Sequence, residues 1–220
     1  MSKRVVLVVG AHPDDEILGV GATLARHTEE GDEVHALILC EGMSLRYGDA
    51  KEDFLAAEAK AAAKVLGFST LTLNGFPDQR LDRQSLVEIA APIERKVGEL
   101  KPNVVYTHWS GDINRDHALA HEATLIATRP KVSSIESIYA YETPSETECG
   151  IPYNFSPNHF VEVSEYLERK LEAMRCYASQ SPGPRHPRSV EHLRLRAHYW
   201  GQCMMMTAAE PFVTLRSYWR

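Results

Sequence analysis

The chain has 220 residues, of which 44% are hydrophobic and 25% are charged, as in an ordinary globular protein. This length suits a single α/β domain spanning residues 1–220, with enough material for a sizeable core. The formal net charge of -6 and the lack of a long Lys/Arg run argue against general nucleic-acid binding. No apolar run approaches the ~20 residues that a membrane span needs.

The four cysteines are scattered along the chain and form no C-x-x-C pair. This spacing excludes a zinc ribbon and argues against a disulfide scaffold. The apolar run near the N-terminus is too short for a signal peptide and meets charged residues at once. We therefore expect a cytoplasmic protein with free thiols, and a homo-oligomer is compatible with the sequence.

Apolar runs and helix-forming segments alternate through the first half of the chain. The first run, VVLVV, is typical of a strand buried on both faces of a parallel sheet. The expected strands are 5–9, 33–40, 70–73 and 102–107, and the expected helices are 15–30, 53–66 and 86–100. This alternation predicts a Rossmann-like, doubly wound α/β fold with a mostly parallel sheet and right-handed crossovers.

The alternation weakens in the second half of the chain. Strands are expected at 135–141 and 159–163, with a helix at 164–177. The stretch 179–188 holds three prolines and a glycine and should be a loop. A last helix is expected at 189–206.

Two segments rich in metal-ligand residues follow the first and fourth expected strands. The first, A-H-P-D-D-E, covers 11–16, and the second, T-H-W-S-G-D-I-N-R-D-H, covers 107–117. In doubly wound sheets, ligands bind beyond the carboxyl ends of the strands, where the strand order reverses. We therefore expect the two segments to face each other.

The first segment can chelate a cation from a single turn. Carboxylates and neutral imidazoles are good zinc ligands, so His12 and Asp15 could bind one ion while Asp14 accepts a proton. A catalytic zinc typically has three protein ligands and an open position, and His117 is the natural third ligand. His108 and His121 compete for that role. Alternatively, the acids only cap a helix and favour its dipole.

These motifs resemble those of the PIG-L/LmbE-like zinc deacetylases. The six-residue motif after a Val-rich strand and the distant Asp-His pair carry the resemblance. Segment 19–23 also looks like the family's first helix, and 186–189 and 209–212 are similar to the branch acting on bacterial sugars. The resemblance implies a three-layer fold, one Zn²⁺ per chain, and a small-molecule N-acylated amino sugar or sugar conjugate as substrate.

The resemblance also assigns roles to individual residues. It implies that His12, Asp15 and His117 hold the zinc. It makes Asp14 the general base and Asp116 an aspartate that supports the site through hydrogen bonds.

Asn114 is a departure from the family, because many members have a histidine there that stabilises the oxyanion or protonates the leaving amine. Asn114 could donate a neutral hydrogen bond but could not act as the acid. His186 is the candidate replacement, if its proline-flanked loop folds over the pocket, and the alternative is an exposed loop histidine.

Three further residues are candidates for substrate binding. Arg46 resembles the family's arginine that contacts the sugar or a phosphate, and Arg188 could do a similar job. Trp109, beside the metal segment, could stack on a sugar ring. The alternatives are a solvated arginine and a tryptophan of the core or rim.

Two other functions remain open at this point. A phosphoesterase would usually need two metals ~4 Å apart and bridging carboxylates, which Glu16, Asp112 and Asp116 could provide. The missing histidine favours the second alternative, a degenerate family member that binds metal without activity.

Overall fold

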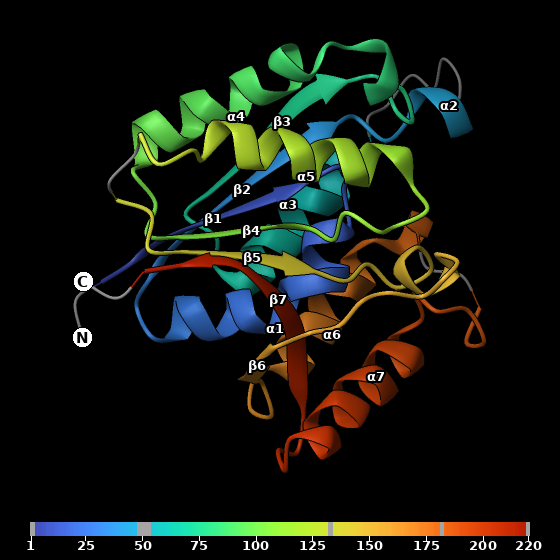
Figure 1. Ribbon diagram of the computed structural model, residues 1–220. Coiled ribbons are helices and arrows are strands. Elements are labelled where there is room, and N and C mark those ends of the chain that lie inside the picture. Colours follow the sequence, from blue (N-terminus) through green and yellow to red (C-terminus); the bar gives the residue numbers. More distant parts are fainter. Residues whose placement is uncertain (1–2, 48–53, 132–133, 181–182, 219–220) are drawn as a thin grey trace.

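The computed structural model describes residues 3–47, 54–131, 134–180 and 183–218. Within these residues one sheet has the strand order β3-β2-β1-β4-β5-β7-β6 (Figure 1). The first five strands in this order run parallel, and β7 lies antiparallel to both β5 and β6. The strands are β1 (Val5–Gly10), β2 (Glu33–Cys40), β3 (Thr70–Phe76), β4 (Val104–His108), β5 (Ser137–Tyr141), β6 (His159–Glu162) and β7 (Ala209–Ser217).

Helices cover both faces of the sheet and make a three-layer α/β fold (Figure 1). Helices α4 and α5 pack on one face, and α1, α3, α6 and α7 form the layer on the other. The helices are α1 (Asp15–Glu29), α2 (Ser44–Tyr47), α3 (Phe54–Leu66), α4 (Leu86–Leu100), α5 (Arg115–Ala127), α6 (Leu167–Cys176) and α7 (Val190–Cys203).

Strand β1 shows why its sequence is continuously apolar. Successive side chains of a strand point to opposite faces of the sheet. Leu7 and Val9 therefore join the core under α4 and α5, whereas Val6 and Val8 pack in the core that α1 covers. Because both faces are buried, every position of the strand has to be apolar.

The strand order reverses at β1, which pairs with β2 on one side and β4 on the other. The carboxyl ends of β1 and β4 are therefore adjacent. The segments that follow them, 11–14 and 109–114, meet at this edge as expected for a topological switch point.

The predicted fold class is confirmed, and three elements differ from the sequence expectations. The expected elements include no helix at 44–47 or 115–127 and no strand at 209–217. Strand β7 carries Glu210 and Pro211, which are uncommon within strands. Glu210 is tolerated because its buried carboxylate pairs with Lys170 Nζ at 2.6 Å, a contact between distant parts of the chain.

Within the described residues, no helix has the length and hydrophobicity needed to cross a membrane. The four cysteines are free, as predicted, and Cys40 is buried.

Gly19 allows α1 to approach the end of β5. A Cβ at this position would overlap the Tyr141 ring and lie 2.8 Å from the backbone oxygen of Glu142. We therefore expect Gly19→Ala to lower the free energy of unfolding by about 1–3 kcal/mol, since overpacking forces its neighbours to move.

Gly98 in α4 provides the matched control, because no atom lies within 4 Å of a Cβ added there. Gly98→Ala should raise stability by up to about 1 kcal/mol through helix propensity. Urea denaturation measures both variants, and equal effects from the two would contradict the close-packing argument.

Candidate active site

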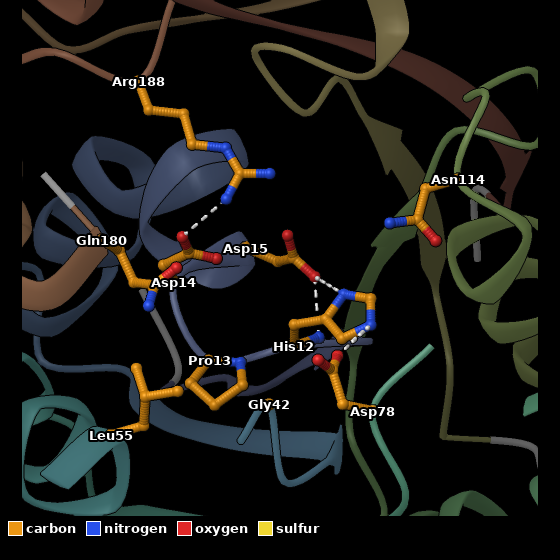
Figure 2. A pocket seen from close by; sticks show the side chains of 10 residues that line it. All are labelled: His12, Pro13, Asp14, Asp15, Gly42, Leu55, Asp78, Asn114, Gln180 and Arg188. Atoms are coloured by element: carbon orange, nitrogen blue, oxygen red, sulfur yellow. Dashed lines mark hydrogen bonds and ion pairs between the residues drawn. The ribbon is translucent and has the colours of Figure 1, made fainter. Parts of the chain in front are cut away.

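Asp14 occupies the N-cap position of α1 without capping the helix. Its φ of 110° lies in the left-handed region, and its side chain makes no capping hydrogen bond. The carboxylate instead lies 3.1 Å from Arg188 Nη1, at the pocket (Figure 2). Strained backbone of this kind tends to cluster at functional sites. The geometry therefore goes against a pure helix-capping role for Asp14.

Three buried side chains bring their donor atoms together beside Asp14. One donor atom each from His12, Asp15 and His117 lies within 4.8 Å of the other two. His117 is fully buried, and its Nε2 has no hydrogen-bond partner although it lies 3.5 Å from Asp15 Oδ2. Buried polar atoms are normally paired. Nε2 of His117 therefore fits a metal ligand, and the donor set of two imidazoles and a carboxylate suits zinc.

Each of these two histidines also contacts a second carboxylate, through the ring nitrogen on the other side from Asp15. His117 Nδ1 lies 2.9 Å from Asp112 Oδ2, and His12 Nε2 lies 3.1 Å from Asp116 Oδ2. With Nε2 of His12 donating to Asp116, its Nδ1 is left 3.4 Å from Asp15 Oδ2. Such partners fix the tautomer and orientation of metal-binding histidines. Asp116 thus lies where the predicted supporting role requires.

The two competing histidines are engaged elsewhere. His108 Nε2 accepts a hydrogen bond from the Ala11 backbone N–H at 2.9 Å, so its lone pair is occupied. His121 Nδ1 lies 2.8 Å from the backbone oxygen of His108. Burial lowers the pKa of both His108 and His117 to about 4, so both rings are neutral at physiological pH. Of the three, His117 alone has its ring nitrogen directed at Asp15 without a partner.

The geometry gives little support to a two-metal site. Two further donor groups, His12-Cys40-Asp116 and His108-Asp112-His117, each reuse a histidine of the first group. Both carboxylate oxygens of Glu16 already accept hydrogen bonds, one from the Asp14 N–H and one from the Tyr177 hydroxyl, which argues against a bridging role. Burial also raises the pKa of Glu16 to about 8. Within the described residues, no independent second cluster of these ligand types accompanies the first.

Asn114 lines the pocket from the start of α5. Its Oδ1 accepts a hydrogen bond from the Asp116 backbone N–H at 3.0 Å, which makes Asn114 the N-cap of that helix. The amide nitrogen is therefore turned toward the pocket, as Figure 2 shows. This orientation offers a neutral hydrogen-bond donor where many family members have a histidine.

Arg188 reaches the pocket from the segment before α7. Its Nη1 contacts Asp14, its Nη2 lies 2.9 Å from Glu146 Oε1, and its Nε lies 2.7 Å from Ser145 Oγ. The side chain is only 12% exposed. Arg188 was predicted as a substrate residue, and among these three partners only the candidate base, Asp14, lines the pocket.

His186 does not lie where a replacement for the missing histidine would have to be. The side chain is exposed, and its Nδ1 accepts the Arg188 backbone N–H at 3.1 Å. The His186 side chain is therefore at the surface, whereas the Arg188 side chain of the same segment lines the pocket. The expectation that His186 lines the pocket is therefore wrong.

Trp109 is not among the described residues that line the pocket. Trp109 donates from Nε1 to Asn154 Oδ1 at 3.1 Å and packs edge-on against Phe155, as a rim tryptophan would. Arg46 belongs to α2, and its side chain lies outside the described residues.

The pocket is small and its lining includes residues that the sequence analysis did not select. Its volume of about 10 Å³ is close to the space that one water molecule needs. Asp78 follows β3 at the same sheet edge, so the strand-end rule could have identified it. Gln180 carried no sequence signal. The lining consists of His12, Pro13, Asp14, Asp15, Gly42, Leu55, Asp78, Asn114, Gln180 and Arg188 (Figure 2).

Comparison with known proteins assigns the chain to a family. A family model, PIG-L: GlcNAc-PI de-N-acetylase, matches residues 7–128. A diacetylchitobiose deacetylase of Thermococcus kodakarensis is 30% identical over 211 residues, covering 90% of this chain and 78% of the relative. A 4-oxalmesaconate hydratase of Pseudomonas putida is 29% identical, covering 81% of this chain and 74% of the relative. The chain belongs to the PIG-L family, as the resemblance predicted.

A solved structure shares the fold. The N,N'-diacetylchitobiose deacetylase of Pyrococcus horikoshii superposes with a TM-score of 0.79 at 20% sequence identity. The match covers 96% of this chain and 84% of that one, so nearly the whole described architecture has a counterpart.

The geometry of the three donor residues predicts which histidine controls metal binding. We expect His117→Gln to lose most of the zinc that the wild type retains, about one ion per chain, because catalytic zinc sites rely on three protein ligands. Elemental analysis after dialysis measures the content.

His121→Gln is the matched control, since His121 bonds to a backbone oxygen and is absent from the donor groups. Its zinc content should stay at the wild-type level. Equal retention of zinc by the two variants would contradict the assignment of His117 as a ligand.

Proposed function

We propose that this protein is a zinc-dependent deacetylase that removes an N-acyl group, preferably acetyl, from an amino sugar or sugar conjugate. Membership of the PIG-L family and the named deacetylase relative support the reaction class. The observation that carries the proposal is the buried, unpartnered Nε2 of His117 facing Asp15.

The proposed metal ligands are His12, Asp15 and His117, with one zinc per chain. When bound, zinc polarises an acyl carbonyl and lowers the pKa of water toward ~7. Asp112 and Asp116 hold the two imidazoles in the tautomers that a metal requires.

Asp14 is the proposed general base. It takes a proton from the attacking water, whose oxygen forms a bond to the acyl carbon. The Asn114 amide N–H donates a hydrogen bond to the oxygen that becomes negatively charged. Asp14 then returns the proton to the amine nitrogen as the C–N bond breaks. The products are a free amino sugar and a carboxylate, and a base in this position typically contributes ~10²–10⁴-fold.

Arg188 takes the place that His186 was expected to fill at the pocket. Its guanidinium pairs with Asp14 at 3.1 Å and thereby favours the carboxylate form that a base needs. Because the guanidinium keeps its proton at any working pH, Arg188 stabilises charge and does not act as the acid.

The pocket is lined mostly by polar and charged side chains, which supports a polar carrier such as a sugar for the acyl group. The preference for acetyl rests on the deacetylase relative. Asp78 and Gln180 offer polar groups for sugar hydroxyls. Arg46 and Trp109 stay predictions as substrate contacts, as do the single-domain organisation and a cytoplasmic location.

A panel of N-acylated amino sugars tests the function. We expect primary-amine release by the wild type, loss of turnover with a zinc chelator, and recovery on adding zinc. Asp14→Asn should lower kcat by about 10²-fold or more, because the amide cannot accept the proton. Fluorescamine detection of amines measures the rates.

Asp82→Asn is the matched control, since Asp82 is exposed and lies outside the pocket lining. Its kcat should equal that of the wild type. Hydration of 4-oxalmesaconate without amine release from any sugar would overturn the deacetylase proposal in favour of the other activity named among the relatives.

Asn114→Asp separates catalysis from folding. The carboxylate can still accept the Asp116 N–H and cap α5, but it presents an anion to the pocket instead of a donor. We expect kcat to fall by about 10²–10³-fold, as when an oxyanion donor is removed, with little change in KM or thermal midpoint. An unchanged kcat would remove Asn114 from the mechanism.

A further inference from the structure

The segment after β5, residues 143–147, contacts both halves of the candidate site, and we call it the bridging loop. On the metal side, Thr147 Oγ1 donates to Asp112 Oδ1, and Thr143 Oγ1 lies 3.1 Å from His108 Nδ1. On the base side, Ser145 and Glu146 contact Arg188. The loop therefore touches the partners of both the proposed ligand and the proposed base.

Internal hydrogen bonds fix the shape of the bridging loop. The Thr143 N–H donates to Thr147 Oγ1 at 2.7 Å, and the N–H groups of Glu146 and Thr147 both donate to the Thr143 oxygen at 3.0 Å. Ser145 has a φ of 82°, in the left-handed region, and its N–H donates to Glu148 Oε1 at 2.8 Å. A non-glycine residue persists in this conformation only where its surroundings hold it.

The first arm of the loop runs through Asp112 to His117. Asp112 is 8% exposed, and its two oxygens accept from the Thr147 hydroxyl and from His117 Nδ1. The His117 ring is thus held with Nε2 facing Asp15. A carboxylate that is itself hydrogen-bonded orients a metal-binding histidine and raises its basicity.

The second arm runs through Arg188 to Asp14. Ser145 Oγ accepts from Nε of Arg188, and Glu146 Oε1 accepts from Nη2. These two bonds fix the plane of the guanidinium and leave Nη1 for Asp14. A planar guanidinium has only one orientation that satisfies all three partners.

We propose that the bridging loop is the positioning element of the site. It holds a metal ligand through Asp112 and the general base through Arg188, by two separate sets of hydrogen bonds. This inference rests on the proposed function. The residues of the bridging loop are positioning residues, because they act on the site through Asp112 and Arg188. Changes at Asp112 and at the Glu146 side chain each break one arm without removing the internal hydrogen bonds of the loop, whereas a change at Thr147 also removes the acceptor of the Thr143 N–H.

Thr147→Val tests the metal arm, with Asp112→Asn as a second variant of the same arm. Both should weaken zinc binding roughly 10-fold or more, as measured by chelator competition, and should alter the visible spectrum of the cobalt-substituted protein. Thr128→Val is the matched control, because Thr128 is a buried threonine whose hydroxyl bonds to a backbone oxygen in α5.

Thr128→Val should lower the thermal midpoint about as much as Thr147→Val while keeping wild-type zinc affinity. Zinc affinities that agree within about twofold for the two threonine variants would overturn the metal arm.

Glu146→Gln tests the base arm. It should lower kcat about 10-fold with KM and zinc affinity unchanged, since misplacing a reacting group by about 1 Å is costly. Ser145→Gly tests the other hydrogen bond of this arm. In ¹⁵N NMR, the Nε–H proton of Arg188 should exchange with solvent faster in this variant than in the wild type, because Ser145 Oγ no longer accepts its hydrogen bond. Glycine accepts the φ of this position without strain.

Zinc weakening in Glu146→Gln equal to that in Thr147→Val would overturn the two separate arms. So would a wild-type kcat in Glu146→Gln together with an unchanged Arg188 signal in Ser145→Gly. Zinc affinity and the arginine signal need no turnover. A failed amine-release assay would therefore reject the proposed function and still leave the bridging loop tested.

Discussion

The carboxylate of Asp15 is the group on which the arrangement of the site depends. It is 1% exposed, and its Oδ2 lies 3.3 to 3.5 Å from nitrogens of His12, His108 and His117. An ionised carboxylate buried to this extent is costly unless positive charge or donors surround it. The backbone N–H of His12 supplies one donor at 2.7 Å. The rings of His108 and His117 are neutral. A cation bound between Asp15 and the histidines would therefore supply positive charge that these two rings do not provide.

The surroundings of Asp15 are organised in layers. Asp112 pairs with His117 and Asp116 pairs with His12, and these contacts determine which ring nitrogen of each histidine faces Asp15. Thr147 of the bridging loop in turn donates a hydrogen bond to Asp112. Backbone groups complete the shell, because the Leu81 N–H donates to Asp116 Oδ1 at 3.1 Å. Such satisfied networks keep a polar cluster in one geometry inside a low-dielectric core.

Asn114 stands where many family members have a histidine, and this difference changes which residues can move protons in the site. A histidine there could both donate a hydrogen bond and exchange a proton, whereas the Asn114 amide can donate a hydrogen bond to the pocket but cannot exchange a proton. In our proposal Asp14 alone therefore takes the proton from water and returns it to the amine nitrogen. Arg188 supports this division of labour, since it stabilises the anionic form of Asp14 without competing for the proton.

Much of the fold and the centre of the site follow from local sequence patterns. The alternation of apolar runs with helix formers predicts the parallel strands, because a strand buried on both faces admits few polar residues. The motif at 11–16 lies where β1 ends, and Asp116-His117 lies in the first turn of α5. Residues close in sequence have their relative positions set by the backbone itself. This is why His12, Asp14 and Asp15 could be selected together, and why strand order then suggested His117.

The remaining features were decided by tertiary packing. Asp14 and Arg188 are 174 residues apart, and only the path of the segment before α7 determines that Arg188 enters the pocket while His186 turns outward. The choice of His117 over His121 depends on which ring nitrogen is already occupied, which spacing cannot reveal. Thr147 and Glu146 look like ordinary loop residues until the end of β5 brings them beside Asp112 and Arg188. Sequence periodicity determines which residues are buried, but the direction of a side chain within a cluster depends on contacts between distant segments.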